Sequence, residues 1–505
     1  MAVTDDMTGR VQRPGAATAN VASALRSLPQ ALFTPKLPVP VLLYLIAVVL
    51  PIAFPLGPLA MTTLRLLLLI MVVPLMVQML SGAYGKVLLP DILFILHMVW
   101  AVVALAVNNP DQVIQQVGSV AIEFLGGYVI GRAYIRTPEA FAALCKALVV
   151  IVLLMLPFAI FEALTGRPLI IEILNKIPGL KSLPTVTYEK RLGLERVQMV
   201  FAHPIHYGLF CSVAFSLAFV ALRGISGTVW RFGTSVLVAG AGFLALSSGA
   251  LLAIALQIGL ISWAILFART KKRWKLLLGL FAVAYVVVDL LSNRTPIDVL
   301  MTYATFSPYN AYWRKLVFEW GMVNVWDNPY FGIGLNDWKR PAFMAYNGSV
   351  DNFWLMAAMR YGIPGFLLLV GGYVFGIWRI LLRNFDSDPM LLNFRRAWIF
   401  TFLGLSFTLC TVHIWSNIYS FTFFMFGAGM WFITAIPATT DQPAAPAPLR
   451  PEIRRTGAKP DSPGTGAKPG HPGTGANPPA AIARTGQDDP ASNRFSRFPP
   501  VTKAD

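Results

Sequence analysis

The chain has 505 residues, of which 56% are hydrophobic and 13% are charged, and its mean hydropathy is +0.62. A soluble fold of ordinary composition cannot bury that much apolar surface, so the sequence predicts an all-α polytopic membrane protein. The formal net charge of +17 would favour a nucleic-acid ligand in a soluble protein. Here the basic residues lie in short connections beside apolar segments, where they set membrane orientation, and this excludes nucleic acid as a partner.

The N-terminal segment, residues 1–36, has no compact apolar region and no cleavage site of the kind found in signal peptides. We expect it to lie in the cytoplasm, with export depending on the first membrane helix. The three cysteines, Cys145, Cys211 and Cys410, lie in apolar runs without CxxC spacing. Neither a disulfide framework nor a zinc site is therefore indicated.

Residues 37–436 contain about twelve apolar segments that are long enough to cross roughly 30 Å of hydrocarbon. They are Leu37–Leu56, Leu59–Leu80, Val87–Val107, Val113–Ile130, Phe141–Leu164, Phe201–Leu222, Val229–Ser247, Ala250–Phe267, Trp274–Leu291, Ile363–Leu382, Ala397–Trp415 and Tyr419–Ile436. Every second connection is basic, and Lys and Arg are enriched in cytoplasmic loops. This asymmetry predicts that both termini are cytoplasmic and that two long connections, 165–200 and 292–352, face outward.

The first outer loop breaks the charge pattern because it is itself basic. Its Lys and Arg residues are Arg167, Lys176, Lys181, Lys190, Arg191 and Arg196. Long loops tolerate such charge, so one interpretation is a solvated loop. The other is that these residues bind an anionic ligand.

The first outer loop leads into a membrane helix through the sequence Phe-Ala-His-Pro-Ile-His, residues 201–206. Pro204 suits the first helical turn, where its missing N–H costs nothing. His203 and His206 are three residues apart and are expected to share one face near the mouth of the bundle. Both are candidate site residues, and the alternative is that they are capping or packing residues at the interface.

The second outer loop contains a short amphipathic pattern and a glycine pair. Trp313, Leu316, Val317 and Trp320 fit one face of a short helix lying at the membrane interface, with Arg314 pointing to polar space. Gly332 and Gly334 permit a tight turn or a close backbone approach. A lone Gly-x-Gly without strand and helix context does not indicate nucleotide binding.

The loop ends at Ser349-Val350-Asp351-Asn352, where a helix begins again. Asp351 or Ser349 is expected to be its N-cap. Alternatively, Asp351 accepts a proton from an attacking hydroxyl at the membrane surface. The outer loops lack Asp-x-Asp and His-Glu-x-x-His spacing, which predicts a site without metal.

After Ile436 the composition changes to Pro, Ala, Gly and charged residues, with a Thr-Gly-Ala repeat at Thr456, Thr465 and Thr474. Such a segment buries too little apolar surface to order itself. We expect residues 437–505 to be a disordered cytoplasmic tail without a catalytic role.

Taken in order, these motifs resemble those of the O-antigen ligase and Wzy-type polysaccharide polymerase superfamily. The matched residues are Arg196, Phe201, His203 and Pro204, then Arg314, then Pro329, Gly332 and Gly334, and finally Asp351, Asn352, Leu355, Gly362 and Gly365. The chain departs from the family pattern where Asp351 replaces a His, Ser248 replaces an Arg, His206 replaces an Asn and Met199 replaces a Gly. The missing His weakens a ligase assignment more than a polymerase assignment.

The resemblance implies a GT-C-like membrane fold in the bacterial inner membrane and a substrate of oligosaccharide on undecaprenyl diphosphate. It implies no cofactor, because the energy of the reaction lies in the diphosphate donor. A flippase and a chain-length regulator of the same pathway are the partners it suggests. The catalytic candidates are Asp351, His203, Arg196 and Arg314, and the substrate-binding candidates are Arg191, His206, Arg340, Asn352, Trp313, Gly332 and Gly334.

Three alternative functions are consistent with this sequence. The first is polymerisation of lipid-linked repeat units into exopolysaccharide or O-antigen, and the second is ligation of the glycan to a lipid A core or another acceptor. The third is transport of a lipid-linked oligosaccharide, which would depend on intramembrane polar residues such as Glu123 and His97. The two halves of the chain show no internal repeat, which disfavours a transporter.

Overall fold

The computed structural model describes residues 36–56, 59–186, 188–292, 299, 308–345 and 348–437. The chain divides into two compact units, Met1–Ala435 and Ile436–Asp505. The first 35 residues of the predicted cytoplasmic segment and all but the first residue of the predicted tail lie outside the described residues. The account that follows concerns the first unit.

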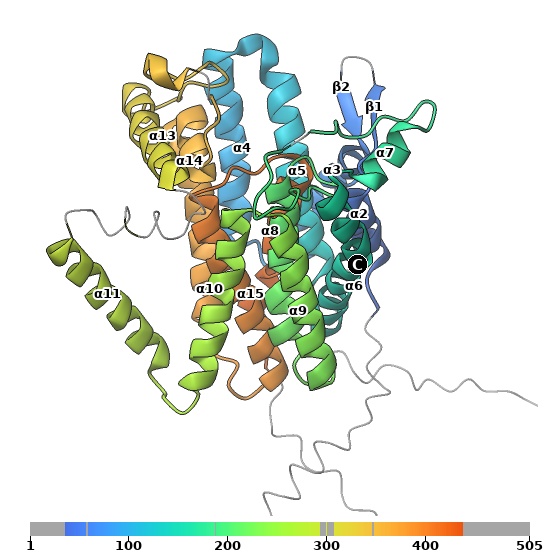
Figure 1. Ribbon diagram of the computed structural model, residues 1–505, viewed down its shortest axis with the longest axis vertical. Coiled ribbons are helices and arrows are strands. Elements are labelled where there is room, and N and C mark those ends of the chain that lie inside the picture. The colour runs from blue at the N-terminus through green and yellow to red at the C-terminus, as the bar shows by residue number, and fades with distance from the viewer. Residues whose placement is uncertain are drawn as a thin grey trace, which may run out of the picture. The chain divides into compact units, whose positions relative to one another are not determined.

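The described part of the first unit is built almost entirely from helices (Figure 1). The longer ones are α2 (Val39–Val49), α3 (Thr63–Leu80), α4 (Leu89–Asn108), α5 (Val113–Tyr134), α6 (Pro138–Thr165), α8 (Pro204–Ser216), α9 (Thr228–Leu244), α10 (Ser248–Leu266), α11 (Arg273–Leu291), α13 (Pro308–Asp327), α14 (Phe353–Leu381), α15 (Pro389–Leu409) and α16 (Ser416–Gly427). The short ones are α7 (Leu169–Asn175), η2 (Pro110–Gln112), η3 (Leu217–Ala221), η4 (Ala342–Met344) and η5 (Met430–Ile433).

Each of the twelve predicted apolar segments contains a helix, but eight helices among the described residues are long and apolar enough to cross a membrane. The first segment falls short because its helix ends at Val49 and the chain enters a hairpin of β1 (Ala53–Leu56) and β2 (Leu59–Thr62). Pro51 and Pro55 explain this, since proline cannot continue a helix. The prediction of a multi-pass helical membrane protein is confirmed, whereas the count of twelve spans stays a prediction.

Small residues allow the central helices to approach closely. α16 packs along α5, and α14 packs along α4. A Cβ at Gly127 of α5 would collide with Ser420 of α16, and one at Gly372 of α14 would collide with Phe94 of α4. Small residues at helix contacts are the usual solution in membranes, where burial of apolar surface does not itself drive association.

Two arginines inside the bundle have acidic partners. The Arg65 guanidinium of α3 lies 2.8 Å from the Glu123 carboxylate of α5. Arg132 of α5 lies 3.5 Å from Asp91 of α4 and also donates to two backbone carbonyls. His97 donates a hydrogen bond from Nδ1 to the Gly365 carbonyl, 2.8 Å away. The polar residues that a transporter would use are thus engaged in contacts between helices.

Two helices stand out: α13, which lies in the second long connection, and α11, which precedes that connection. α13 is longer than the short helix predicted, and residues of its apolar face pack against another helix. Val317 and Val325 pack instead with Leu355 and Met359 of α14 in a second apolar cluster. By contrast, α11 diverges from the bundle in Figure 1, and none of its residues is buried.

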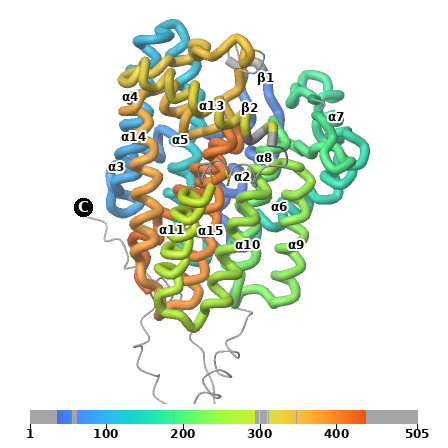
Figure 2. The backbone as a smooth tube through the Cα atoms, turned by 60° about the vertical axis from the view of Figure 1, so that its left-hand side comes forward, coloured from blue at the N-terminus to red at the C-terminus, as the bar shows by residue number. Residues whose placement is uncertain are grey.

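Both long connections lie at the same end of the bundle. α7 of the first and α13 of the second are at the upper end in Figure 1, and the α10–α11 connection is at the lower end. Figure 2 shows the same arrangement from another side. That this end faces the outside of the membrane stays a prediction.

Candidate functional site

The segment 195–203, which precedes α8, is held by a carboxylate from the bundle. Glu162 of α6 accepts hydrogen bonds from the backbone N–H of Gln198 at 2.7 Å and of Met199 at 3.1 Å. Met199 has a φ of 54°, a conformation that is costly for a residue with a side chain. Because Glu162 is 3% exposed, these bonds lie away from water and fix the segment that carries Arg196 and His203.

His203 is the N-cap of α8, with Pro204 in the first turn as predicted. Its Nδ1 accepts the N–H of Ile205 at 3.1 Å, so the capping alternative is confirmed for this residue. Burial, together with the charges of Arg196 and Arg191, lowers the pKa of His203 to about 4. The imidazole is therefore neutral at pH 7, with Nε2 left for other contacts.

Three histidines come together at the start of α8. The His203 and His206 rings lie 6.3 Å apart, and Trp415 packs against His206 at 4.0 Å between centroids. His413 stacks on Trp415 at 5.9 Å and on Phe353 at 6.3 Å. His206 Nε2 and His413 Nδ1 are buried and have no hydrogen-bond partner among the described residues.

The arginines of the two long connections share one neighbourhood. The positive charges of Arg191 and Arg196 both interact with His203, and the charge of Arg191 also interacts with Arg314 of α13. Burial, and then the charge of Arg191, lower the pKa of Arg196 to about 10. Arg191 donates to the Leu246 carbonyl at 2.8 Å, which anchors it to the α9–α10 connection.

Arg314 is the member of this group that belongs to the second connection. Burial lowers its pKa, the charge of Asp351 opposes that shift, and Arg191 adds to it. Among the described residues, no carboxylate lies within ion-pair distance of Arg314 or Arg196. Instead, the Arg196 guanidinium lies over the Tyr188 ring at 5.4 Å. The site therefore contains several positive charges, and the acidic side chains among the described residues neutralise them only in part.

The N-cap of α14 differs from the prediction. Asn352, rather than Asp351 or Ser349, accepts the N–H of Leu355 at 3.0 Å. This leaves the Asp351 carboxylate exposed, with Ser349 Oγ at 3.4 Å, and near enough to Arg314 for their charges to interact. Asn352, a predicted substrate-binding residue, has a side-chain oxygen committed to the helix.

The predicted glycine pair has a role within the protein. Gly332 and Gly334 have φ values of 66° and 62°, as a tight turn requires. Ile333 N–H bonds the Met359 carbonyl at 2.7 Å, and Gly334 N–H bonds the Arg360 carbonyl at 3.2 Å. A Cβ on Gly332 would collide with the backbone of Met359 and Arg360. The close backbone approach that was predicted is therefore made to α14.

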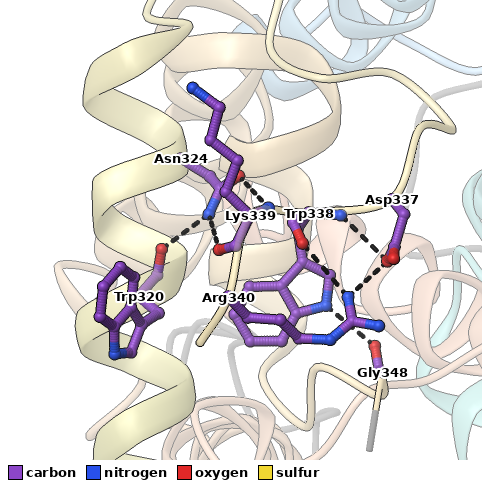
Figure 3. A network of polar contacts seen from close by, with 7 residues as sticks. All are labelled: Trp320, Asn324, Asp337, Trp338, Lys339, Arg340 and Gly348. Atoms are coloured by element: carbon purple, nitrogen blue, oxygen red, sulfur yellow. Dashed lines mark hydrogen bonds and ion pairs between the residues drawn. The ribbon is translucent and has the colours of Figure 1, made fainter. Parts of the chain in front are cut away.

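Arg340 and Trp313, both predicted to bind substrate, also make internal contacts. Figure 3 shows Arg340 paired with Asp337 and bonded to the Trp338 carbonyl at 3.2 Å. In the same network, the Asn324 side chain bonds the Lys339 N–H and carbonyl, each at 2.8 Å. Trp313 stacks on Tyr309 at 6.0 Å, and its Nε1 is buried with no hydrogen-bond partner in the part of the chain that the structure describes.

A small cavity of about 60 Å³ lies beside His206 at the start of α8. It is lined by His206, Phe201 and Ala202 on one side and by Pro51, Ser416 and Asn417 on the other, among other residues. Its volume suits a few water molecules rather than a sugar ring. Among the described residues, no group of three His, Cys, Asp or Glu side chains is placed to hold a metal ion.

Glu162, His413 and Trp415 were not among the predicted site residues. Glu162 is 36 residues from the Gln198 amide it binds, and His413 is far along the chain from His206. No local spacing connects these residues, so only the packed structure could identify them. The one sequence signal was that Glu162 is a carboxylate inside an apolar run.

No curated protein matches the chain. Residues 233–370 match the family model described as O-antigen ligase. The matched range runs from α9 to the first half of α14 and includes Arg314, Gly332, Asp351 and Asn352. This family covers ligases and polymerases, which are membrane enzymes of the glycosyltransferase kind with lipid-linked oligosaccharide substrates. The chain is therefore a multi-pass membrane protein in which residues 233–370 are similar to the O-antigen ligase family.

Proposed function

We propose that the protein is a polysaccharide polymerase that joins undecaprenyl-diphosphate-linked repeat units at the periplasmic face of the inner membrane. The observation that carries this proposal is the convergence of Arg191, Arg196 and Arg314 from two separate connections at one end of the bundle. Guanidinium groups bind phosphate oxygens with paired hydrogen bonds. A lipid diphosphate would bring negative charge beside Arg196 and Arg314, which have no ion pair among the described residues.

In the proposed reaction, a hydroxyl of the acceptor sugar attacks the anomeric carbon of the donor. The bond between that carbon and the diphosphate oxygen breaks, and the electron pair leaves with the diphosphate. Arg196 and Arg314 would stabilise the charge that develops on the phosphate oxygens. The diphosphate is already a good leaving group, which supports a reaction without a nucleotide.

The proton of the attacking hydroxyl needs an acceptor, and Asp351 is the first choice. Its carboxylate is exposed rather than used as a helix cap, and Arg314 lies near it. His203 is the second choice. Its low pKa keeps the imidazole neutral, as a base must be, but its Nδ1 is occupied by the helix cap. We assign His203 to orienting the acceptor.

Ligation to a lipid A core or another acceptor would use the same donor and the same arginines. It differs from polymerisation only in the acceptor, which the site does not display. We place polymerisation first because Asp351 stands where ligases of the family carry a His. The transporter alternative receives less support, because Glu123 is paired with Arg65 and His97 is bonded to Gly365.

The test supplies the purified full-length protein, in lipid nanodiscs, with lipid-linked repeat units. Polymerisation gives a ladder of longer lipid-linked glycans, and Arg196→Ala and Arg314→Ala are expected to abolish it. Arg167→Ala is the matched control, since Arg167 is an exposed arginine of the same outer connection that pairs with Glu172. Asp351→Asn tests the base.

The outcomes separate the alternatives. Transfer to a lipid A core without a ladder would support ligation, and movement of the lipid between leaflets without new glycosidic bonds would support transport. A ladder that persists in both arginine variants would contradict the assignment of the diphosphate site. Unchanged turnover in Asp351→Asn would remove Asp351 from the role of base.

A further inference from the structure

A second group of arginines lies at the opposite end of the bundle from the candidate site. It consists of Arg223, which follows η3, Arg231 of α9, Arg273 of α11 and Arg396 of α15, and we call it the basic-end cluster. The elements that carry these residues meet at the lower end of the helices in Figures 1 and 2. Arg231, Arg273 and Arg396 are half-buried, and Arg223 is exposed.

Side-chain packing brings two members of the cluster together. Trp274 of α11 packs edge-on against Phe400 of α15 with 5.7 Å between the ring centroids. The Arg273 guanidinium lies over the Trp274 ring at 5.7 Å. Arg396 is one helical turn before Phe400 and therefore lies on the same face of α15. The α11–α15 contact thus places Arg273 and Arg396 beside each other.

The other two members reach the same place through η3. α15 packs along η3, and the chain leaves η3 toward Arg223. Arg231 donates to the Phe219 carbonyl of η3 and lies over the Phe219 ring at 4.9 Å. The positive charge of Arg223 acts on both Arg231 and Arg396, and that of Arg273 acts on Arg396. The four guanidinium groups therefore share one electrostatic neighbourhood.

The described residues supply little negative charge there. The negative charge of Asp386 interacts with Arg396 without forming an ion pair. No carboxylate of the described residues forms an ion pair with any member of the cluster. Elsewhere, the half-buried Arg65 and the buried Arg132 each have an acidic partner. Like charges held together away from water raise the free energy of the folded state. An anion bound among them would remove that cost.

The surroundings indicate what kind of anion would bind. Basic residues at helix ends also set membrane orientation, but that role does not require them to converge. Trp230, Phe232, Trp274 and Leu276, which adjoin the cluster in sequence, are exposed and apolar. We propose that the basic-end cluster binds the phosphate of an acidic membrane lipid, with the acyl chains against these apolar side chains. This site is independent of the proposed glycosyl transfer at the other end.

The test measures lipid binding to the full-length protein by native mass spectrometry in detergent. Phosphatidylglycerol is the acidic probe, phosphatidylcholine the zwitterionic one and inorganic phosphate the free anion. The double variant Arg223→Gln/Arg396→Gln removes two members of the cluster. Lys271→Gln/Lys272→Gln is the matched control, because it removes the same charge from exposed residues of the α10–α11 connection.

We expect phosphatidylglycerol to bind the native protein more tightly than phosphatidylcholine. The cluster variant should lose about 30-fold in affinity, at roughly 1 kcal/mol for each charge. The control variant should lose less than about threefold, and inorganic phosphate should not displace the lipid. Equal melting temperatures in phosphatidylcholine will show that both variants fold.

Three results would overturn the proposal. Equal losses of affinity in the two double variants would show that total charge, rather than a site, attracts the lipid. Equal binding of phosphatidylglycerol and phosphatidylcholine would exclude headgroup recognition. Displacement of the lipid by inorganic phosphate at comparable concentration would show a site for the free anion.

Discussion

The substitution Glu162→Ala tests whether the segment 195–203 is held as the structure indicates. The alanine removes the acceptor for the buried N–H groups of Gln198 and Met199. Each buried donor left unpaired costs about 1–3 kcal/mol. The strained backbone of Met199 adds to the tendency to relax. We expect the free energy that orders this segment to fall by about 3–5 kcal/mol.

Hydrogen–deuterium exchange of the purified protein measures this effect locally. Protection of the 195–203 amides should fall by about two to three orders of magnitude, while that of α4 and α14 should not change. Global stability should change less, because removing a buried carboxylate also removes its own desolvation cost. Glu162→Gln keeps an oxygen acceptor and should lose much less protection. Unchanged protection of the segment in Glu162→Ala would refute the reasoning.

Three further predictions concern other parts of the site. Because the pKa of His203 is lowered to about 4, the unfolded chain binds its proton first as the pH falls from about 6.5. Stability should therefore drop by up to about 3 kcal/mol between pH 6.5 and 4, and His203→Asn, which keeps a capping oxygen, should flatten this part of a pH series of melting temperatures. Gly332→Ala should destabilise the folded protein by about 2–4 kcal/mol, because the alanine is strained at positive φ and its Cβ collides with α14. Gly279→Ala is the control: there is open space around this position, so the melting temperature should be unchanged or slightly raised in the same thermal assay. Asn324→Ala should leave the Lys339 N–H and carbonyl unpaired, cost about 2–4 kcal/mol and speed proteolytic cleavage at Lys339; cleavage at the native rate would contradict the network in Figure 3.

Local patterns predicted the helices and several of their ends. Apolar runs located the membrane segments, and His203-Pro204 marked the start of α8. Where several residues could fill the same role, tertiary contacts determine which of them does. Asp351, Ser349 and Asn352 are all good caps, but the Phe353 N–H bonds the Val412 carbonyl of another connection. That contact accompanies a helix start capped by Asn352.

The site itself was predictable only in part. Sequence order and the family pattern selected Arg196 and Arg314, because basic residues in outer connections are conspicuous beside apolar segments. The carboxylate that holds the segment carrying Arg196 was not visible, since Glu162 comes from another helix. The predicted apolar face of α13 was recognised, but its partner was not. Amphipathicity shows that a face is covered and does not distinguish lipid from another helix.

Ion pairing separates the structural arginines of this protein from those proposed to act on ligands. Arg65 and Arg132, which connect helices, each have a carboxylate partner within the bundle. Arg196 and Arg314 at one end, and Arg396 at the other, are at least half-buried and have no ion pair among the described residues. Removing one partner of a buried pair leaves an uncompensated charge and is strongly destabilising, whereas removing a buried charge without a partner relieves a cost. Loss of ligand binding without loss of folding is therefore the outcome that the unpaired arginines should give, and it distinguishes both end sites from the paired arginines of the core.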